Sequence, residues 1–582
     1  RLKTRIAESS PFFMRIEQGY FFAGLFCVRK AGSLFKYSRQ NFLCREKKKN
    51  RQKGVFMAQI NVSNLTFGYE GSYDTIFENV SFSIDTSWKL GFVGRNGKGK
   101  TTFLQLLLGK YEYQGAITRS VVFDYFPYPV KQKDLERTAA ELMEDWKAGV
   151  ESWRVLCELE KVDMDAELLY RPFGTLSFGE RTRVMLAVLF SGENDFLLID
   201  EPTNHLDQDA REIIKKYLAS KKGFILVSHD RDLLDACIDH VLVLNRASIE
   251  VQSGNFSSWW ENKEKADNFA RMEHEKHVKE IGKLKAAADR SSRWAEKNEN
   301  TKIGYDPAKE HDRSISTRSY IGAKTKKMQS RVKAYEERMD REIEKKEGLL
   351  KDIETVKDLK IMPLSHYKER LIECRDFSLK YRDGKENVIT GLNFELKQGD
   401  RVFLKGKNGC GKSSLIKYIL TQNLQNSSNG GIEKRKITMS GCENLSGENI
   451  MATGTCSIAS NLVISYINQD TSHLSGTLKE FAKKQEIDEP MLLSMLRSLD
   501  LDREQFVKNM EEFSEGQKKK VLIAASLLTP AYLYLWDEPL NYIDVFSRMQ
   551  IEKLIAQFQP TMLIVEHDAR FAKKLATKVV EL

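Results

Sequence analysis

Short apolar runs recur along this 582-residue chain, each followed by a glycine-rich or acidic segment. The runs WKLGFV and DRVFLK each precede a glycine-rich loop, and FLLI and LYLW each precede a pair of acids. Apolar runs of this length, bounded by turn residues, are typical of buried strands. The pattern predicts α/β domains in which strand, loop and helix follow one another.

The pattern changes between about residues 255 and 360, where the chain is strongly charged and poor in glycine. Apolar residues recur there near helical spacing, and Gly304, Asp306 and Pro307 predict a turn. The first arm is marked by Phe256, Trp260, Phe269 and Met272, and the second by Met328, Val332, Tyr335, Met339, Ile343, Leu350, Ile353 and Val356. We therefore expect an antiparallel helical hairpin, with a first arm of about 65 Å if it runs from 256 to 299.

Much of the remaining chain occurs twice. An offset of 312 residues carries Tyr69 and Gly94 onto a second copy, and the offset is 337 at Ser177 and Glu201 and 338 at His229. The counterparts are Tyr381, Gly406, Ser514, Glu538 and His567. A repeat of this length indicates two whole domains, with an insertion of about 25 residues in the second copy.

Composition narrows the class of protein. Charged residues make up 30% of the chain, and the longest apolar runs are shorter than the roughly 20 residues of a membrane-crossing helix. The eight cysteines form no CxxC pair, which argues against a disulfide framework or a zinc site. We expect a soluble protein without a membrane partner in a reducing cytoplasm.

The net charge of +10 comes from residues 1–56, which hold fourteen basic and three acidic residues, so that residues 57–582 sum to −1. General basicity therefore gives no argument for nucleic-acid binding. We interpret 1–56 as a basic leader outside the natural protein, with Met57 as the natural start. Lys53-Gly54-Val55 can be encoded by AAA-GGA-GTN, which would be a purine-rich ribosome-binding site a few nucleotides before the ATG of Met57. A signal peptide is the alternative, since Tyr20–Val28 is apolar and follows basic residues, but no small-residue cleavage site precedes the first domain.

The loops GRNGKGKTT and GKNGCGKSS fit the pattern GxxxxGK[ST]. Closely spaced glycines let backbone N–H groups converge on the phosphates of ATP at a helix N-terminus. Lys100 and Lys412 add a positive charge, and the hydroxyls of Thr101 and Ser413 are candidate Mg²⁺ ligands. The other candidate ATP-binding residues of the loops are Gly94, Asn96, Gly97, Gly99, Thr102, Gly406, Asn408, Gly409, Gly411 and Ser414.

A pair of acids ends one apolar strand in each copy. The first acid, Asp200 or Asp537, can hold Mg²⁺, and the second, Glu201 or Glu538, can act as general base toward the attacking water. Adjacent buried acids are costly to desolvate unless a cation or a reacting group offsets them. The pairs therefore predict ATP hydrolysis rather than a structural role.

LSFGE and FSEGQ place a serine and a glycine ahead of a helix, a second kind of anion site. With these motifs the chain resembles the ATP-binding cassette family, whose D-loop (204–207 and 541–544) and switch histidine (His229 and His567) also occur. The resemblance implies two cassettes paired head to tail, with ATP between the phosphate loop of one and the signature of the other. Site one would join Lys100, Glu201 and His229 to Ser514 and Gly516, and site two would join Lys412, Glu538 and His567 to Ser177 and Gly179. Gln517 of the second signature is a further candidate ATP-binding residue.

Tyr69 and Tyr381, each 25 residues before its phosphate loop, match the adenine-stacking aromatic of that family. Two positions depart from the family pattern. Gln469 matches the Q-loop glutamine of the family, but the first copy has Tyr128 there, which puts Mg²⁺ contact and interdomain signalling at site one in doubt. Phe178 replaces a usual signature glycine, and we expect binding to survive because the serine hydroxyl and the backbone hold the phosphate.

Charge in the predicted linker is uneven. Residues 313–335 contain seven basic residues and no acid, whereas 336–360 alternates in sign and is interpreted as a solvated face. Uncompensated cations repel one another, which favours RNA phosphates opposite them, with Trp294, Tyr305 and Tyr320 as stacking partners for bases. The candidate RNA-binding residues are Arg313, Arg318, Lys324, Lys326, Lys327, Arg331 and Lys333.

Tandem cassettes joined by a charged hairpin, without a membrane domain, resemble the ABC-F family of ribosome-acting ATPases. DTSWKLGFVGRNGKGKTT and DYFPYP are most similar to its antibiotic-resistance subgroup related to Lsa, which protects against lincosamides, streptogramin A and pleuromutilins. The resemblance implies a cytoplasmic monomer that pairs its own cassettes and binds the E site of the 70S ribosome. Its linker would contact ribosomal RNA and P-site tRNA, dislodge drug from the peptidyl transferase centre, and leave after ATP hydrolysis.

We therefore expect an α/β fold of two tandem nucleotide-binding domains, 57–254 and 363–582, joined by an antiparallel α-helical linker at 255–362. A housekeeping translation factor of the same family remains the main alternative, because it shares every cassette motif. An ATPase subunit of a transporter would leave the long linker without a role. DNA-repair cassette proteins carry zinc-binding cysteine pairs, and chromosome-maintenance ATPases carry far longer coiled coils. Neither feature occurs in this sequence, which argues against both classes.

Overall fold

The computed structural model describes residues 59–69, 75–192, 195–204, 206–244, 249–303, 316–350, 359–382, 386–428, 437–438 and 450–582. Residues 57–582 form one compact unit. The leader predicted at 1–56 lies outside the described residues.

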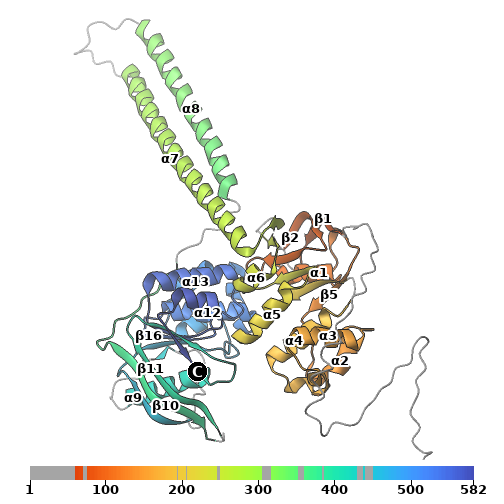
Figure 1. The fold of residues 1–582 in the computed structure, drawn as a ribbon. Helices are drawn as coiled ribbons and strands as arrows, with labels where there is room; N and C mark the ends of the chain where they lie inside the picture. Colours follow the sequence, from red (N-terminus) through yellow and green to blue (C-terminus); the bar gives the residue numbers. More distant parts are fainter. Residues whose placement is uncertain are drawn as a thin grey trace, which may run out of the picture. The chain divides into compact units, whose positions relative to one another are not determined.

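The first cassette contains two sheets (Figure 1). A small antiparallel sheet has the order β2-β1-β4, with β1 (Gln59–Phe67), β2 (Phe77–Asp85) and β4 (Gln114–Thr118). The larger sheet has the order β5-β6-β7-β3-β8-β9, with β3 (Lys89–Val93), β5 (Val122–Phe126), β6 (Asp195–Asp200), β7 (Phe224–Val227), β8 (His240–Leu244) and β9 (Ile249–Ser253). Its strands are parallel except for β9, which runs antiparallel at the edge.

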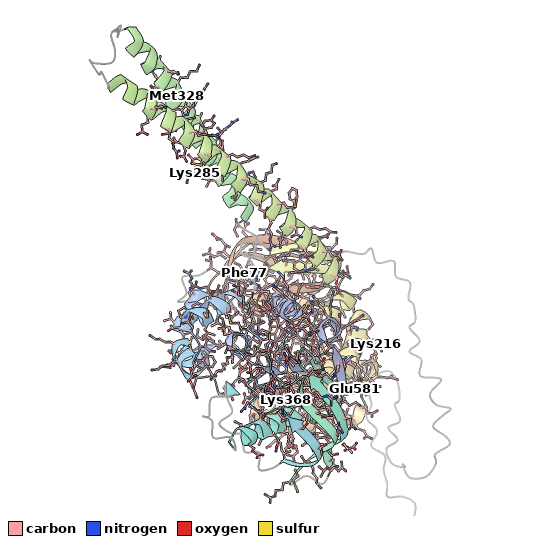
Figure 2. The ribbon with its side chains drawn as sticks, turned by 90° about the vertical axis from the view of Figure 1, so that its left-hand side faces the viewer. Phe77, Lys216, Lys285, Met328, Lys368 and Glu581 are labelled. Carbon is pink, nitrogen blue, oxygen red and sulfur yellow. The ribbon has the colours of Figure 1, made fainter. Side chains whose placement is uncertain are left out.

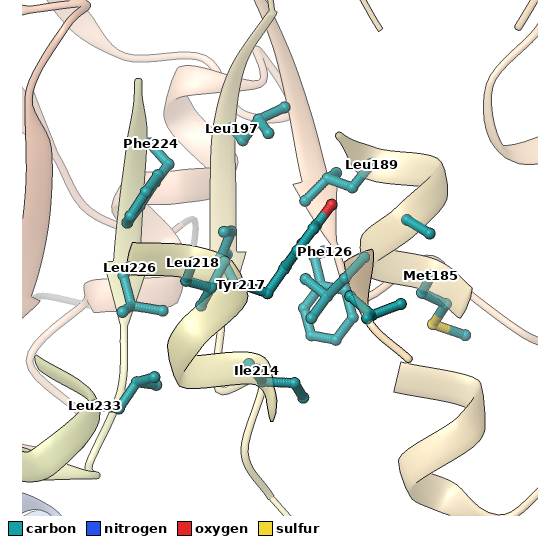
Figure 3. Packing of buried hydrophobic residues seen from close by; sticks show 14 of the residues in the cluster. Phe126, Met185, Leu189, Leu197, Ile214, Tyr217, Leu218, Phe224, Leu226 and Leu233 are labelled. Atoms are coloured by element: carbon teal, nitrogen blue, oxygen red, sulfur yellow. The ribbon is translucent and has the colours of Figure 1, made fainter. Parts of the chain in front are cut away.

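The central parallel strands are apolar and buried over most of their length, as in KLGFV of β3 and FILV of β7, which is typical of a sheet covered on both faces. The helices of this cassette are α1 (Lys100–Leu107), α2 (Ala139–Trp146), α3 (Ser152–Lys161), α4 (Phe178–Leu189), α5 (Gln208–Ala219) and α6 (Arg231–Cys237), with 3₁₀ turns at Gln132–Glu136, Ala166–Tyr170 and Phe173–Thr175. Figure 3 shows Leu197 and Leu226 of the sheet beside Ile214 and Leu218 of α5. This packing fixes the strand ends that carry the acids.

The second cassette repeats this arrangement. Its parallel sheet has the order β13-β15-β16-β17-β12-β18, with β12 (Arg401–Lys405), β13 (Ile437–Thr438), β15 (Ile464–Ile467), β16 (Leu533–Asp537), β17 (Met562–Val565) and β18 (Lys578–Glu581). The antiparallel sheet has the order β11-β10-β14, with β10 (Arg370–Tyr381), β11 (Asn387–Lys397) and β14 (Ile450–Ile458). The helices are α9 (Lys412–Ser428), α10 (Leu478–Lys484), α11 (Glu489–Ser498), α12 (Glu515–Leu528), α13 (Val545–Phe558) and α14 (Ala569–Leu575), with 3₁₀ turns at Arg503–Val507 and Met510–Glu512.

Two long helices, α7 (Phe256–Ile303) and α8 (Ser316–Leu350), lie side by side between the cassettes in the sequence (Figure 1). The predicted α/β fold with a helical hairpin is therefore confirmed. Helix α7 has 48 residues, which gives about 72 Å at 1.5 Å per residue. The predicted turn at Gly304, Asp306 and Pro307 lies outside the described residues. In the described part of the chain, no helix is both long enough and apolar enough to cross a membrane.

The base of α7 belongs to a core that both cassettes share. Phe256 and Trp259 are buried in the apolar cluster of the first cassette, which also includes Val545 and Phe546 of α13. The ring of Phe546 lies 6.3 Å from that of Trp259 and 5.8 Å from that of Trp260. One apolar cluster therefore joins the hairpin to both cassettes.

A buried ion pair reinforces this junction. Arg231 of α6 donates to both carboxylate oxygens of Glu552 on α13, and both side chains are buried. Lys574 lies 3.2 Å from Glu552, but its own side chain is half exposed. Because desolvating a carboxylate is costly, Glu552 depends on these cations.

We predict that Arg231→Ala strongly destabilises the protein, because it leaves Glu552 buried beside a single, partly solvated lysine. Removing one partner of a buried pair costs about 3–5 kcal/mol. The shift of the urea denaturation midpoint measures this destabilisation. The matched control is Lys215→Ala, which breaks an exposed pair with Glu212 and should cost about 1 kcal/mol or less. Equal shifts for the two variants would contradict the prediction.

Candidate active sites

Each glycine-rich loop leads from a strand of a parallel sheet into a helix. We name residues 94–102 the first phosphate loop and 406–414 the second. Gly99 and Gly411 have φ of 99° and 96° directly before α1 and α9. A Cβ would lie 2.5 Å from Ile76 Cγ2 at the first position and 2.7 Å from Val388 Cγ1 at the second. Both the conformation and the lack of space therefore require glycine.

The side chain of each loop lysine folds back into the phosphate loop that precedes it. Lys100 Nζ donates to Gly94 O at 2.7 Å, and Lys412 Nζ donates to Gly406 O at 2.8 Å. Burial lowers the pKa of Lys100, although nearby carboxylates oppose this effect. The carbonyl contacts hold each ammonium group within the loop, where the phosphates of ATP would bring compensating negative charge.

The strand-end aspartates lie beside the loop hydroxyls. Thr101 Oγ1 donates to Asp200 Oδ2 at 3.0 Å, and the Ser413 side chain is hydrogen-bonded to Asp537. Burial raises the pKa of Asp537 to about 6, and Asp537 Oδ1 has no hydrogen-bond partner among the described residues. A buried carboxylate next to a hydroxyl provides hard oxygen donors, and its negative charge needs a cation to balance it. Mg²⁺ binds oxygen donors of this kind.

The second acids adopt a rare backbone conformation in both copies. Glu201 and Glu538 have φ of 50° and 47°, although neither is glycine. Their N–H groups donate to the ends of the neighbouring strands, at Val227 O (2.9 Å) and Val565 O (3.0 Å). Positive φ costs free energy and persists where the surroundings enforce it, typically at functional sites. The repetition indicates that the direction of both carboxylates is constrained.

Glu201 lies against the switch histidine. Its Oε1 is 3.3 Å from His229 Nε2, and its Oε2 accepts the backbone N–H of His229 at 3.4 Å. Burial, with a contribution from the charge of Asp200, raises the pKa of Glu201 to about 8. Burial also holds the pKa of His229 well below its ordinary value. Glu201 thus lies beside a neutral imidazole, and the raised pKa makes its ionised form a stronger base toward water than an ordinary carboxylate.

Glu538 has a different set of partners. Its Oε2 accepts from Gln469 Nε2 at 2.8 Å and from Asn541 Nδ2 at 2.6 Å, and its Oε1 is 3.7 Å from His567 Nε2. Because the amide nitrogen of Gln469 faces Glu538, its carbonyl oxygen is the candidate metal ligand. Two amides therefore orient the carboxylate in the second cassette.

Tyr128 occupies the place of Gln469 but points elsewhere. The residues two positions earlier, Phe126 and Ile467, pair with equivalent residues of β6 and β16, so the strand register aligns the two positions. Tyr128 is 6% exposed, stacks on Trp146 at 5.3 Å and donates to Asp124 Oδ2 at 2.8 Å. At this position the first cassette has a core side chain instead of an amide beside Glu201.

Tyr125 also lies at the first site, although only Tyr128 of the DYFPYP segment was predicted to bear on it. Its hydroxyl donates to Asp200 Oδ2 at 3.1 Å, the same oxygen that accepts from Thr101. The corresponding tyrosine of the second copy, Tyr466, instead donates to Asn468 Oδ1 at 3.3 Å. The sequence indicates Tyr125 only through its position on a strand, β5, that pairs with the strand carrying the acids, β6. Tyr128 follows three residues later, and only packing decides which tyrosine turns toward Asp200.

The two candidate adenine-stacking tyrosines have matching surroundings. The hydroxyl of Tyr69 is hydrogen-bonded to Thr102 Oγ1 at 2.8 Å, and that of Tyr381 to Ser414 Oγ at 2.5 Å. The residues are 42% and 40% exposed. Each ring is tied to its own phosphate loop and has exposed surface on which a base can stack.

Each signature serine begins a helix. Ser177 caps α4 and Ser514 caps α12, each in a capping box with the third residue of the helix, Glu180 or Gln517. The Gln517 side chain accepts the Ser514 N–H at 2.9 Å. Each serine oxygen accepts from a helix N–H, so its own proton remains able to donate to a phosphate.

Site one is assembled from both cassettes. Asn96 Nδ2 of the first phosphate loop donates to Tyr542 O at 2.7 Å. A Cβ on Gly516 would lie 3.0 Å from Asn96 Nδ2 and 2.6 Å from Tyr542 O. Arg95 forms an ion pair with Asp500 at 3.1 Å. The first phosphate loop therefore lies directly against the signature of the second cassette.

Site two also combines the two cassettes, around open space. A cleft of about 430 Å³ is lined by the second phosphate loop, Tyr381, Gln469, Glu538 and Phe178. A second cleft of about 370 Å³ is lined by residues 207–209 of the first cassette and by second-cassette residues that include His567. Phe178, which replaces the usual glycine, thus faces the second phosphate loop from the other cassette.

The described candidate RNA-binding side chains lie on α8. Those of Lys324, Lys326, Lys327, Arg331 and Lys333 are exposed. Arg313, Tyr305 and the side chains of Arg318 and Tyr320 lie outside the described residues. Trp294 on α7 is exposed. Figure 2 shows Lys285 of α7 and Met328 of α8 among the side chains along the hairpin.

Comparison with known proteins agrees with this geometry. The ABC transporter family matches residues 77–204 and 389–541, one segment in each cassette. The chain is 26% identical over 518 residues to "Ribosome protection protein VmlR" of Bacillus subtilis, covering 88% of this chain and 85% of that protein. It is 22% identical to "ABC transporter F family member 2" of Arabidopsis thaliana, covering 92% and 78%. This chain is an ABC-F ATPase.

A solved structure shows the same fold. The complex of archaeal ribosomal stalk protein aP1 and archaeal ribosome recycling factor aABCE1 aligns with a TM-score of 0.53 at 19% identity, covering 89% of this ABC-F chain and 87% of that chain. At this identity the likeness concerns the arrangement of the tandem cassettes alone.

We predict unequal contributions of the two sites to ATP turnover. Glu538→Gln should lower turnover more than Glu201→Gln, because two amides orient Glu538 whereas Tyr128 provides none for Glu201. Steady-state phosphate release by the two single variants measures this difference. Nucleotide binding should be retained in both, since only the base is changed. Equal reductions would rule out the amide contacts as the source of asymmetry.

Proposed function

We propose that this ABC-F ATPase binds the ribosome at the E site in the cytoplasm and protects the peptidyl transferase centre from lincosamide, streptogramin A and pleuromutilin antibiotics. The observation that carries the proposal is the joining of two composite ATP sites to a long hairpin with exposed cations. The similarity to a protein named for ribosome protection extends over 88% of the chain, a share too large for the cassettes to account for without the hairpin.

The proposed hydrolysis follows from the site geometry. ATP would lie between a phosphate loop and the signature serine and glycine of the other cassette, with its adenine on Tyr69 or Tyr381. Asp200 with Thr101, and Asp537 with Ser413, would hold Mg²⁺, which neutralises charge on the phosphates. Glu201 and Glu538 would take a proton from the attacking water, oriented by the switch histidines His229 and His567.

Closure and release follow from the composite sites. Because each site needs groups from both cassettes, bound ATP holds the two cassettes together and hydrolysis removes that link. The shared apolar cluster at Phe256, Trp259 and Phe546 passes such a movement to the base of α7. We propose that the closed form binds the ribosome and that hydrolysis releases it.

The hairpin is proposed to contact ribosomal RNA and P-site tRNA. The exposed lysines of α8 suit phosphate groups, and exposed Trp294 suits stacking on a base. The segment between α7 and α8, residues 304–315, would approach the drug site. An arm of about 72 Å supplies reach that a simple connection between domains does not need.

Drug susceptibility tests the proposed function. A sensitive bacterial host expressing residues 57–582 should survive higher concentrations of lincosamides and pleuromutilins, and the Glu201→Gln, Glu538→Gln double variant should not protect. Unchanged susceptibility with arrested translation by the double variant would instead favour a housekeeping translation factor. Unchanged susceptibility with no ribosome co-sedimentation would reject both.

We predict that the α8 lysines supply salt-dependent affinity. Changing Lys324, Lys326, Lys327 and Lys333 to Gln should weaken ribosome binding and flatten its dependence on salt, by about 0.7–0.9 in the logarithmic slope for each RNA phosphate that a lysine no longer neutralises. Co-sedimentation at several salt concentrations measures both effects, and ATP turnover without ribosomes should not change. Arg338→Gln with Arg341→Gln, in the stretch of alternating charge, is the control and should leave the slope unaltered.

A further inference from the structure

Helix α12 serves both ATP sites. At its start, Gly516 lies against Asn96 of the first phosphate loop, so this end of the helix belongs to site one. The same helix packs within the second cassette, whose own phosphate loop belongs to site two. A shift of α12 caused at site one would therefore reach the second cassette directly.

One turn into α12, Lys519 holds the Q-loop of its own cassette. Its Nζ donates to Asn468 O at 2.8 Å, and the residue is 1% exposed. Glu515, in the first turn, accepts a hydrogen bond from the hydroxyl of Thr471. The segment 468–471 is thus held to α12 at two points, on either side of Gln469.

The Q-loop segment in turn holds the candidate base of site two. Gln469 Nε2 donates to Glu538 Oε2 at 2.8 Å. A continuous series of contacts therefore runs from the first phosphate loop through Gly516 and Lys519 to Gln469 and Glu538. It crosses only one helix turn.

A second connection runs beside the first. Lys520 Nζ lies 2.9 Å from Asp544 Oδ2, with both side chains buried. Asp544 ends the D-loop that contains Asn541, whose side chain also donates to Glu538 Oε2. Helix α12 thus fixes both segments that orient Glu538.

Packing alone does not account for Lys519. A buried ammonium group is costly unless specific contacts compensate for its missing hydration. An apolar side chain would fill this position in a helix core at lower cost. The lysine provides a hydrogen bond to the Asn468 carbonyl, and it also provides a positive charge near Asp537 and Glu538, whose carboxylates oppose the lowering of its pKa by burial. Only the hydrogen bond reaches the Q-loop segment.

The first cassette differs at each of these points. Thr182 and Arg183 of α4 occupy the places of Lys519 and Lys520. Arg183 donates to Gly179 O of its own helix (3.3 Å) and to Asp163 O, directly after α3 (3.3 Å). Tyr128, in the place of Gln469, is turned into the core. Among the described contacts, only the second cassette links its signature helix to its candidate base.

We propose that Lys519 is a positioning residue that makes ATP hydrolysis at site two depend on nucleotide bound at site one. Phosphate held by Ser514 and Gly516 fixes α12, and Lys519 then keeps Asn468, Gln469 and Glu538 in their working positions. The dependence runs in one direction, because α4 lacks the corresponding contacts in the described structure. The inference rests on the proposed composite sites, but not on ribosome binding.

Steady-state ATP turnover by the full chain tests this role. Lys519→Met removes the donor while keeping an unbranched side chain, and should lower kcat about tenfold with KM unchanged, the scale of a misplaced catalytic group. Thr471→Val removes the neighbouring hydrogen bond to Glu515 and should act in the same direction. Thr182→Val, at the matched position of α4, is the control and should retain full turnover. Thermal melting curves verify that each variant is folded.

Combination with Lys100→Ala, which disables site one, distinguishes coupling from a local effect. Lys100→Ala alone should lower turnover at site two, and adding Lys519→Met should lower it little further. Reductions that multiply, or normal turnover by both Lys519→Met and Thr471→Val, would overturn the proposal. Binding of a fluorescent ATP analogue tests the assignment of the two sites separately from the coupling between them. If the sites are correctly assigned, Lys100→Ala should reduce the number of bound nucleotides from two to one, whether or not Lys519 couples the sites.

Discussion

Each parallel sheet brings the carboxyl ends of its strands to one edge, and the buried charges gathered there constrain the rest of the structure. The loop lysine, the paired acids and the switch histidine of each cassette come from separate strand ends that become neighbours only because the strands are parallel. Burial raises the pKa of Glu201 and Asp537 to about 8 and about 6. Such acids are stable in this setting only with hydroxyls, amides or cations arranged around them.

The two copies meet this constraint differently. In the second cassette, Gln469 and Asn541 donate to Glu538, and α12 holds the segments from which both amides come. In the first cassette, Tyr125 donates to Asp200 while Tyr128 joins the core, so Glu201 has the imidazole of His229 as its side-chain neighbour. Duplication therefore preserved the fold and the phosphate loops, whereas the surroundings of the candidate bases diverged.

The hairpin is joined to this chemistry through apolar packing. Phe256 and Trp259 lie in the same cluster as Phe546, which follows the D-loop of the second cassette by two residues. The nearby pair of Arg231 and Glu552 is itself buried. Because packed interiors transmit displacement rather than absorb it, any change in how the cassettes meet reaches the first turn of α7.

The sequence by itself determined the duplicated cassettes, the phosphate loops, the acids and the helical hairpin, since these follow from local periodicity and from motifs whose spacing survives folding. It also located the missing glutamine at Tyr128. Only the tertiary structure decided that Tyr128 stacks in the core, that Tyr125 reaches Asp200, and that Lys519 holds Asn468. These contacts join segments tens of residues apart, and their direction depends on how side chains pack between strands and helices, which no local pattern encodes.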